Sequence, residues 1–288
     1  MFTIKEGLLV KSSSITIGIC QLAVTPDKAL NIRNAERMLK AAAKEKCQVA
    51  ILPEMFNCPY EAELFSRYAE SYPNGDTFTM LSQTAAQERM VVVGGSIPER
   101  DEHGNLYNTS FIFDEQGGLL GRHRKIHLFD VEIAGGTVFK ESNILSAGQD
   151  VTVVKAAGLT LGIGICYDIR FPELSRLMAL SGAKLLIFPG VFGMSTGPAH
   201  WELLMRSRAV DNQVFVAGVA PANFPEASYK VYGHSMVIDP WGRIVSVADD
   251  KEKLLIVEID LEILNKVRRE LPLLQHRRTD VYELRQKI

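Results

Sequence analysis

Two segments of this sequence share one predicted pattern of strand, helix and strand, and this internal repeat limits the folds that the chain can adopt. The first copy runs from Ile15 to Phe56 and the second from Leu159 to Phe192. In each copy, a glycine-containing apolar run precedes a crossover stretch and a second apolar run that ends in proline. Two such units predict two quasi-equivalent halves whose sheets pack together between helical layers. We therefore expect an α/β protein with a four-layer αββα sandwich.

The rest of the chain alternates short β-branched runs with longer stretches of helical periodicity. We expect strands at residues 14–22, 49–52, 91–97, 109–113, 119–125, 151–154, 159–167, 185–188, 214–219, 234–238, 244–246 and 255–259. Helices are expected at residues 29–46, 61–72, 77–88, 172–181, 199–212 and 261–271. Turn signals separate the strands between residues 91 and 125, which predicts antiparallel neighbours there, and residues 130–150 are expected to form a loop.

Composition limits the class of protein. Of the 288 residues 47% are hydrophobic and 23% charged, which is typical of a globular chain with a sizeable core. No linker-like segment interrupts residues 14–288, so we expect one domain there, preceded by a short arm at residues 1–13. The net charge of -2 and the scattered basic residues argue against nucleic acid as a partner. No apolar run approaches the roughly 20 residues that span a bilayer, so no membrane association is expected.

The four cysteines, at positions 20, 47, 58 and 166, lack the paired spacing of metal ligands. They fit free thiols in a reducing compartment, with the cytoplasm as the default. Cys166 follows the glycine-punctuated strand and precedes a helix, so it is expected at a strand's carboxyl end, where ligands bind and a helix N-terminus favours a thiolate. The alternative is a buried cysteine that acts as a small hydrophobe. Cys20 is expected to occupy the matching place in the first copy. It lacks a helix directly after it and is the better candidate for inert core.

Two further polar residues end predicted strands. Glu54 follows an apolar run and Pro53, and a half-buried carboxylate there would have a raised pKa and could act as general base and acid. Lys125 lies at the end of the hairpin run 119–126 and is flanked by the basic residues Arg124 and His127. The alternatives are a solvated carboxylate for Glu54 and a solvated basic strand end for Lys125.

Taken together, three motifs resemble the nitrilase superfamily of carbon-nitrogen hydrolases. They are Leu52-Pro-Glu54, Arg124-Lys-Ile-His-Leu128 and Gly164-Ile-Cys-Tyr-Asp168 with Arg170-Phe-Pro-Glu173. The resemblance covers about residues 15–282 and implies the αββα fold and a triad of Glu54, Lys125 and Cys166. It also implies that Glu141 positions the lysine and the substrate. The runs Tyr107-Asn-Thr109 and Thr196-Gly-Pro-Ala-His-Trp-Glu202 are similar to the omega-amidase branch, which hydrolyses the terminal amide of monoamides such as 2-oxoglutaramate and succinamate.

The resemblance implies a covalent mechanism. Glu54 takes the thiol proton, Cys166 attacks the amide carbonyl, and the Lys125 ammonium and the Tyr167 backbone N–H hold the oxyanion; water then hydrolyses the thioester. No metal or cofactor is expected. Tyr60, Phe129 and Thr196 resemble pocket residues, with plain core packing as the alternative for the two aromatic residues. Arg170 is a candidate for binding the substrate carboxylate, and Arg206 or Arg208 are the alternatives. An ion pair with Asp168 or Glu173 would also account for Arg170.

Other readings of the same residues stay open. The triad could act on an N-carbamoyl amine, a deaminated-glutathione-like amide or a nitrile. A binding or scaffold protein on this fold is a third hypothesis, from a different class, and the complete triad argues against it. The resemblance implies a homodimer or a higher homo-oligomer, and apolar positions in the segment 267–283 are compatible with an arm that crosses to a partner.

Overall fold

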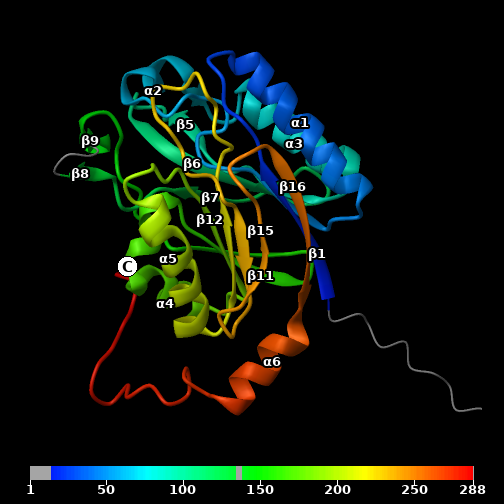
Figure 1. The fold of residues 1–288 in the computed structure, drawn as a ribbon, viewed down its shortest axis with the longest axis vertical. Coiled ribbons are helices and arrows are strands. Elements are labelled where there is room, and N and C mark those ends of the chain that lie inside the picture. The colour runs from blue at the N-terminus through cyan, green and yellow to red at the C-terminus, as the bar shows by residue number, and fades with distance from the viewer. Residues whose placement is uncertain (1–13, 134–137, 288) are drawn as a thin grey trace, which may run out of the picture.

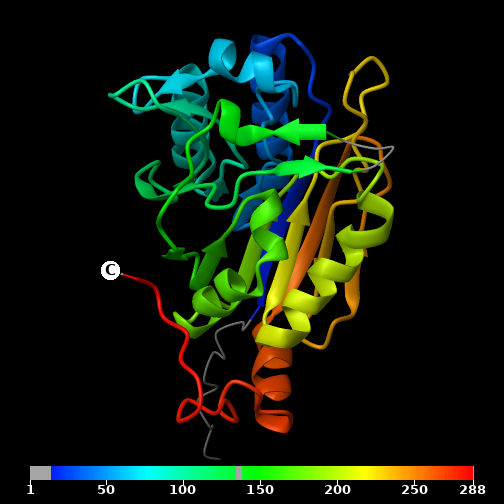
Figure 2. The same ribbon diagram turned by 90° about the vertical axis from the view of Figure 1, so that its left-hand side faces the viewer.

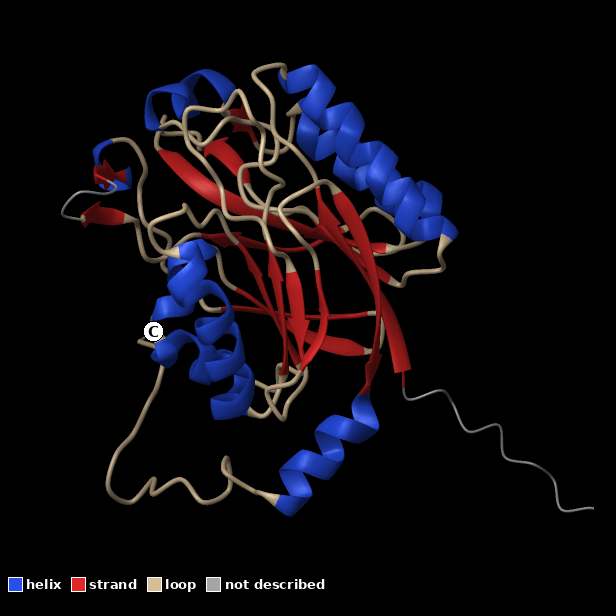
Figure 3. Cartoon of the chain, viewed as in Figure 1, coloured by secondary structure: helices blue, strands red, loops and turns tan. Residues whose placement is uncertain are grey.

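The structure, a computed structural model, describes residues 14–133 and 138–287, so the arm predicted at residues 1–13 lies outside the described residues. Two sheets stack face to face, and helices cover the outer face of each (Figures 1 and 3). The four-layer αββα sandwich is therefore confirmed. None of the helices in the described ranges is long and apolar enough to cross a bilayer.

The first sheet carries the N-terminal copy of the repeat. Its strands lie in the order β16 (Lys253–Asp260), β1 (Ser14–Gln21), β2 (Val49–Ile51), β4 (Val91–Val93), β6 (Leu106–Phe113), β5 (Ile97–Arg100) and β3 (Glu70–Ser71), and β7 (Leu119–Arg124) also pairs with β6. Helices α1 (Lys28–Lys44) and α3 (Asp76–Glu88) cover its outer face, and α2 (Ala62–Tyr68) lies at one end (Figure 1). The antiparallel pairing of β5, β6 and β7 agrees with the hairpins predicted there.

The second sheet carries the other copy. Its order is β10 (Thr152–Ala156), β11 (Leu159–Ile163), β12 (Leu185–Pro189), β13 (Phe215–Val219), β14 (Met236–Ile238) and β15 (Ile244–Val247). Helices α4 (Pro172–Leu180) and α5 (Gly197–Asn212) cover its outer face. Helix α6 (Leu261–Glu270) follows β16, and the chain then runs back on the side of α4 (Figure 2).

The core between the sheets is built from alternating positions of facing strands. Ile17 and Ile19 of β1 and Leu161 and Ile163 of β11 are fully buried there. Burial of such a side chain stabilises the fold by about 1.5–3 kcal/mol. This apolar layer fixes the position of one sheet on the other, and both sheets contribute strand ends to the site described below.

Strand register shows how the two halves correspond. Gly18 of β1 pairs with Ala50 of β2, three residues before Pro53, and Gly162 of β11 pairs with Leu186 of β12, three residues before Pro189. Gly18 therefore corresponds to Gly162. By the same count Cys20 corresponds to Gly164 and not to Cys166, so the match expected between the two cysteines is wrong by two residues. Cys20 is buried inside β1, which agrees with its assignment to the core.

Several local expectations differ from the structure. The helix expected at 61–72 ends at Tyr68, before β3, and the strand expected at 159–167 ends at Ile163. The strand predicted at 91–97 is broken at Gly94 and Gly95. Gly95 has φ +52°, and a Cβ there would lie 2.0 Å from the carbonyl oxygen of Pro53, so only glycine allows this close turn. The region predicted as a loop at 130–150 contains a short antiparallel pair, β8 (Asp130–Glu132) and β9 (Val138–Lys140).

Candidate active site

The four predicted catalytic side chains meet in one fully enclosed cluster. Lys125 Nζ lies 3.2 Å from Glu54 Oε1 and 2.8 Å from Glu141 Oε2. The Cys166 thiol is within hydrogen-bonding reach of the Glu54 carboxylate. Glu54, Lys125 and Glu141 have no exposed surface, and Cys166 is 4% exposed. Because charged side chains are rarely buried completely, this grouping marks a functional site.

Glu54 is held by the loop that follows β2. Ser96 organises this loop, because its backbone N–H donates to Pro53 O and its hydroxyl accepts from the Met55 N–H. The carboxylate accepts two further hydrogen bonds, from the backbone N–H of Val191 to Oε2 at 2.6 Å and from Asn108 Nδ2 to Oε1 at 2.8 Å. These donors fix the orientation of the carboxylate and stabilise its ionised form.

Lys125 follows the last residue of β7, and its main chain is pinned on both sides. Its N–H donates to Asn108 O, and its carbonyl accepts from the Gly148 N–H, each at 2.8 Å. Alternation along β7 turns this side chain into the protein, so the alternative of a solvated strand end is wrong.

Glu141 begins the one-turn helix η1 (Glu141–Asn143) directly after β9. Its Oε1 accepts hydrogen bonds from Tyr60 Oη and Lys125 Nζ, both at 2.9 Å. Its Oε2 accepts from the Phe129 N–H at 2.7 Å. Two of the predicted pocket residues therefore contact the site, Tyr60 through its hydroxyl and Phe129 through its backbone.

Cys166 lies where β11 gives way to the one-turn helix η2 (Cys166–Arg170). Its φ of +48° is in the left-handed region, which costs a residue with a Cβ of order 1–3 kcal/mol. The turn is closed by Asp168, whose backbone N–H donates to Ile165 O and whose carboxylate accepts from the Ile165 N–H. The Sγ atom lies 3.5 Å from Val191 O. The strained turn thus points the sulfur towards Glu54.

The electrostatics of the cluster follow from one cation between two carboxylates. Burial raises the pKa of Glu54, Lys125 opposes this, and Glu141 adds to it. Burial lowers the pKa of Lys125, but Glu141 and Glu54 outweigh that effect and the pKa rises overall, so the ammonium is permanent. Burial and then the Glu54 charge raise the pKa of the Cys166 thiol well above its ordinary value. This direction opposes the thiolate expected at the helix N-terminus, because desolvation and the like charge of Glu54 both disfavour the ionised thiol.

The site also offers a donor for a developing oxyanion. Among the described residues, no acceptor pairs with the backbone N–H of Tyr167, the first N–H after the nucleophile. An unpaired N–H at the start of a helical turn is suited to bind negative charge. The Tyr167 ring packs edge-on against Phe129 at 5.2 Å, which keeps water from one side of the cluster.

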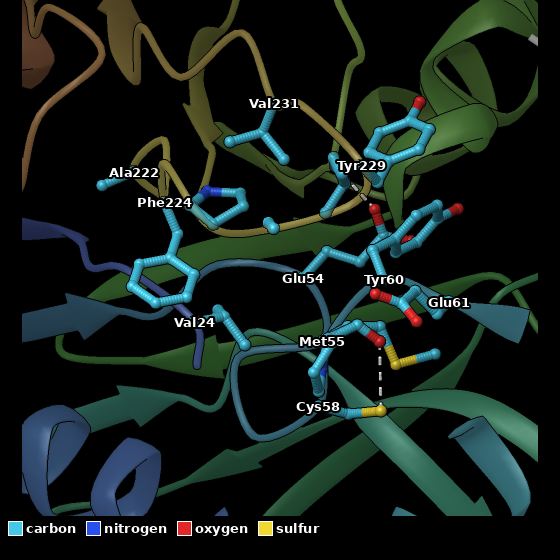
Figure 4. Close-up of a pocket in the computed structure, with 14 residues that line it drawn as sticks. Val24, Glu54, Met55, Cys58, Tyr60, Glu61, Ala222, Phe224, Tyr229 and Val231 are labelled. Atoms are coloured by element: carbon cyan, nitrogen blue, oxygen red, sulfur yellow. Dashed lines mark hydrogen bonds between the residues drawn. The ribbon is translucent and has the colours of Figure 1, made fainter. Parts of the chain in front are cut away.

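A mostly apolar pocket opens onto the cluster at Glu54 (Figure 4). Figure 4 shows Tyr60 beside Tyr229, whose ring centroids lie 5.3 Å apart, with Glu54 close to both. Val191 joins the pocket to the nucleophile, since its carbonyl faces Cys166 Sγ. The pocket lining includes no lysine or arginine; it consists of Val24, Glu54, Met55, Cys58, Pro59, Tyr60, Glu61, Val191, Pro221, Ala222, Phe224, Ala227, Tyr229 and Val231.

The other predicted binding residues lie outside this pocket lining. Arg170 Nη1 lies 3.2 Å from His200 Nδ1, and its guanidinium lies over the rings of Phe192 and Tyr167. Within the described ranges it forms no ion pair with a carboxylate, so the expected alternative of a pair with Asp168 or Glu173 is wrong. Thr196 is the N-cap position of α5 and its side chain makes no capping bond.

Sequence reasoning missed two supports of Glu54. Asn108 and the Val191 N–H hold its two oxygens. Asn108 stands inside the motif Tyr107-Asn-Thr109, and its position in the middle of a buried strand is the one local signal that it does more than pack. In the other contact, the backbone N–H of Val191, in the second half, donates to the Glu54 carboxylate in the first. Because any residue except proline can supply such a donor, the residue type gives no signal of it.

A cysteine, a glutamate and a lysine in a buried cluster at strand ends of an αββα sandwich form an arrangement suited to hydrolysis through a thiol nucleophile. A sequence profile of the carbon-nitrogen hydrolase family matches residues 16–269. The chain belongs to this family.

Individual relatives narrow the position within the family. The chain is 46% identical to the omega-amidase NIT2 of Danio rerio over 94% of this chain and 98% of that protein. It is 44% identical to the omega-amidase NIT2 of Mus musculus over 96% of this chain and 99% of that protein. Among solved structures it resembles Saccharomyces cerevisiae Nit3, a member of branch 10 of the nitrilase superfamily, with a TM-score of 0.85 and 41% identity over 92% of this chain and 97% of that one.

Proposed function

We propose that this protein hydrolyses the terminal amide of a short dicarboxylate monoamide, of the 2-oxoglutaramate or succinamate type, to the acid and ammonia. The observation that carries the proposal is the position of Glu54, whose carboxylate lies within reach of both the Cys166 thiol and the Lys125 ammonium. The names of its omega-amidase relatives support the choice of substrate class.

In the first half of the proposed reaction, Glu54 takes the proton of Cys166, and Sγ bonds to the amide carbon. The oxyanion is held by Lys125 Nζ and by the Tyr167 N–H, each worth roughly 3 kcal/mol in such a role. Glu54 then returns its proton to the amide nitrogen, the carbon-nitrogen bond breaks, and ammonia leaves a thioester on Cys166. Because the resting thiol is protonated, the sulfur becomes charged only as its proton is transferred to Glu54.

In the second half, Glu54 takes a proton from water, and the resulting hydroxide adds to the thioester carbon. The same two donors hold the second oxyanion. The carbon-sulfur bond breaks, the carboxylic acid leaves, and the proton on Glu54 returns to Sγ. Glu54 thus serves as base and acid in turn, for which a raised pKa is suited. Glu141 holds Lys125 and, with Tyr60, forms one wall of the site.

Arg170 is the proposed partner of the substrate's free carboxylate. Its support is the absence of a carboxylate partner within the described residues and its position over Tyr167, the residue next to the nucleophile. A charge-assisted bond of this kind contributes about 1.5–3 kcal/mol. Phe129 and Thr196 complete the proposed binding residues. In the second candidate function the substrate is an uncharged amide, a carbamoyl amine or a nitrile, and the pocket at Glu54, with no basic side chain in its lining, favours that reading.

A substrate panel combined with one variant separates these functions. Ammonia release is measured on succinamate, 2-oxoglutaramate, an uncharged amide of the same length and a nitrile. We expect the charged amides to react fastest and Arg170→Met to raise their KM by about 10-fold or more without affecting the uncharged amide. Arg206→Met, which removes a cation paired with Glu202 on the surface of α5, is the control. A faster reaction with uncharged substrates would replace the monoamide proposal, and no turnover of any substrate would favour a binding protein.

The wider context is also proposed. We propose that residues 14–288 form a single domain, that the chain assembles as a homodimer or a higher homo-oligomer, and that it acts in the cytoplasm. Exposed apolar side chains on and beside α5, Leu203, Val210 and Trp241, support self-association. The four buried free cysteines support a reducing compartment. Light scattering of the purified chain tests the assembly, and a mass of one chain would contradict it.

A further inference from the structure

A second buried carboxylate lies beside the catalytic cluster and has no part in the reaction proposed above. Asp168, two residues after the nucleophile, is fully buried and accepts four hydrogen bonds. Its Oδ1 accepts from the His127 N–H at 2.9 Å and from His127 Nδ1 at 2.7 Å. Its Oδ2 accepts from the Ile165 N–H at 2.9 Å and from His123 Nε2 at 3.0 Å.

This carboxylate is an anion at neutral pH. Burial raises the pKa of Asp168, but the bonds from His123 and His127 outweigh burial and hold the pKa below its ordinary value. An ionised carboxylate has no proton to donate, so the ring nitrogens that face it must both carry hydrogen. The tautomers are therefore fixed, and each histidine is held in one orientation.

The two histidines bracket Lys125 in the sequence, one two residues before it and the other two residues after it. Each is held a second time. His123 Nδ1 lies 3.0 Å from Thr152 Oγ1 of β10, and the His127 ring stacks on Phe171 at 3.6 Å. Asp168 therefore joins the segment that carries the lysine to the turn that carries the cysteine.

From these contacts we infer that Asp168 is a positioning residue, which holds Lys125 at its working distance from Cys166 through His123 and His127 and keeps the Cys166 turn closed through the Ile165 N–H. The role in closing the turn follows from the backbone. Ile165 directly precedes Cys166, whose φ is +48°. The Ile165 N–H donates to the Asp168 carboxylate, and the Ile165 carbonyl accepts from the Asp168 N–H. A strained turn persists only where its surroundings over-determine it. Asp168 does not touch the reacting atoms and acts through the residues that do.

The test separates positioning from stability. Asp168→Asn keeps the size of the side chain but turns one acceptor into a donor that faces N–H groups. We expect kcat to fall about 100-fold, since a displacement of about 1 Å in a site has that effect, with KM changed less than about 3-fold. Alkylation of Cys166 by iodoacetamide, followed by mass spectrometry, is expected to slow as well. Glu70→Gln is the matched control, because Glu70 is another buried carboxylate and is bonded to Thr77 and Lys28, which do not contact the catalytic cluster. It should lower Tm while kcat and alkylation stay unchanged.

His127 provides a second pair of variants that does not disturb the core, since its side chain is 28% exposed. His127→Gln can keep a side-chain donor to Asp168 and loses the ring, whereas His127→Phe keeps a ring over Phe171 and loses the donor. If the hydrogen bond positions Lys125, the glutamine variant retains most of the activity and the phenylalanine variant loses about 10-fold or more in kcat. The reverse order overturns the inference.

The inference rests on the proposed function only for its kcat measurements. If the wild-type protein hydrolyses no amide, the proposed function fails, but the alkylation rate of Cys166 still reports whether Asp168 and His127 govern the site. Unchanged alkylation in Asp168→Asn and His127→Phe, with a loss of Tm similar to that of Glu70→Gln, would reduce Asp168 to a structural residue.

Discussion

Lys125 contacts both carboxylate oxygens of Glu141, at 2.9 Å and 2.8 Å, but only one oxygen of Glu54, at 3.2 Å. The lysine is therefore anchored by Glu141, while Glu54 keeps lone pairs available for proton transfer. This asymmetry agrees with separate roles for the two buried glutamates, one in proton transfer and one in holding the lysine.

Glu141→Gln tests that division through the pH profile. The Glu141 charge helps to raise the pKa of Glu54, so its removal lowers that pKa. The general base must be ionised, so the acid limb of kcat/KM is expected to move to lower pH, while kcat falls about 10-fold or more as Lys125 loses its anchor. Glu70→Gln, at a buried carboxylate that binds Thr77 and Lys28, should leave the limb in place. A shift to higher pH would contradict the arrangement.

Asn108→Leu should move the same limb in the opposite direction. Asn108 donates to Glu54 Oε1, and loss of a donor to a carboxylate raises its pKa. Asn108 Oδ1 is buried without a partner, so an apolar side chain of similar size should cost little stability while kcat drops about 10-fold. Asn212→Leu is the control, since Asn212 has the same unpartnered Oδ1 but lies far along α5. Equal activity of the two variants would remove Asn108 from the site.

Glu54→Gln is expected to abolish turnover and yet stabilise the fold. The rate should fall by about 100- to 10,000-fold with loss of the acid-base group. Because the folded-state pKa of Glu54 is raised, its ionised form destabilises the protein progressively as pH rises from 4.5 through that pKa. At pH 7 the variant, with one cation and one carboxylate left in the cluster, should therefore melt at a higher temperature than the wild type. The difference should vanish at low pH; thermal unfolding across pH 4 to 8 checks the sign.

Tyr60→Phe removes the hydroxyl that donates to Glu141 Oε1 at 2.9 Å. A hydrogen bond to a charged group is worth about 1.5–3 kcal/mol, so we expect kcat to fall roughly 10-fold while the ring still stacks on Phe139. The comparison is Tyr68→Phe, which removes a hydroxyl bonded to Pro26 O outside the site. Steady-state kinetics of both variants decide the matter; equal kcat values would show that the hydroxyl only fills space.

Much of the architecture was readable from local pattern. Period-2 and period-3.6 runs located the strands and helices, and the duplicated unit at 15–56 and 159–192 predicted two packed sheets. The hydrophobic pattern did not predict features that depend on backbone geometry. Gly95 turns the chain against Pro53 O, a contact that no propensity encodes. The residue types suggest that Cys20 corresponds to Cys166. The strand register, in which Gly18 corresponds to Gly162, shows that Cys20 corresponds to Gly164.

The site divides in the same way. Glu54 and Cys166 each follow an apolar run and Lys125 ends the predicted hairpin region, so the place of all three at strand ends was predictable. The role of Glu141 is implied by the family resemblance. Asn108 was not assigned a role because its contact with Glu54 depends on which strand neighbours β6. The local sequence around Cys166 shows only the strand-to-helix turn, which favours a thiolate. The opposing charge of Glu54, which raises the pKa of the thiol, becomes visible only in the assembled cluster.

The position of Glu54 on one half and Cys166 on the other has a mechanical consequence. Neither sheet alone carries both the base and the nucleophile. The apolar layer that includes β1 and β11 therefore sets the distance between the Glu54 carboxylate and the Cys166 sulfur. A slip of one sheet over the other changes the distance between base and sulfur before it exposes either core. On heating, we therefore expect catalytic activity to be lost at a lower temperature than the far-UV circular dichroism signal of the native fold.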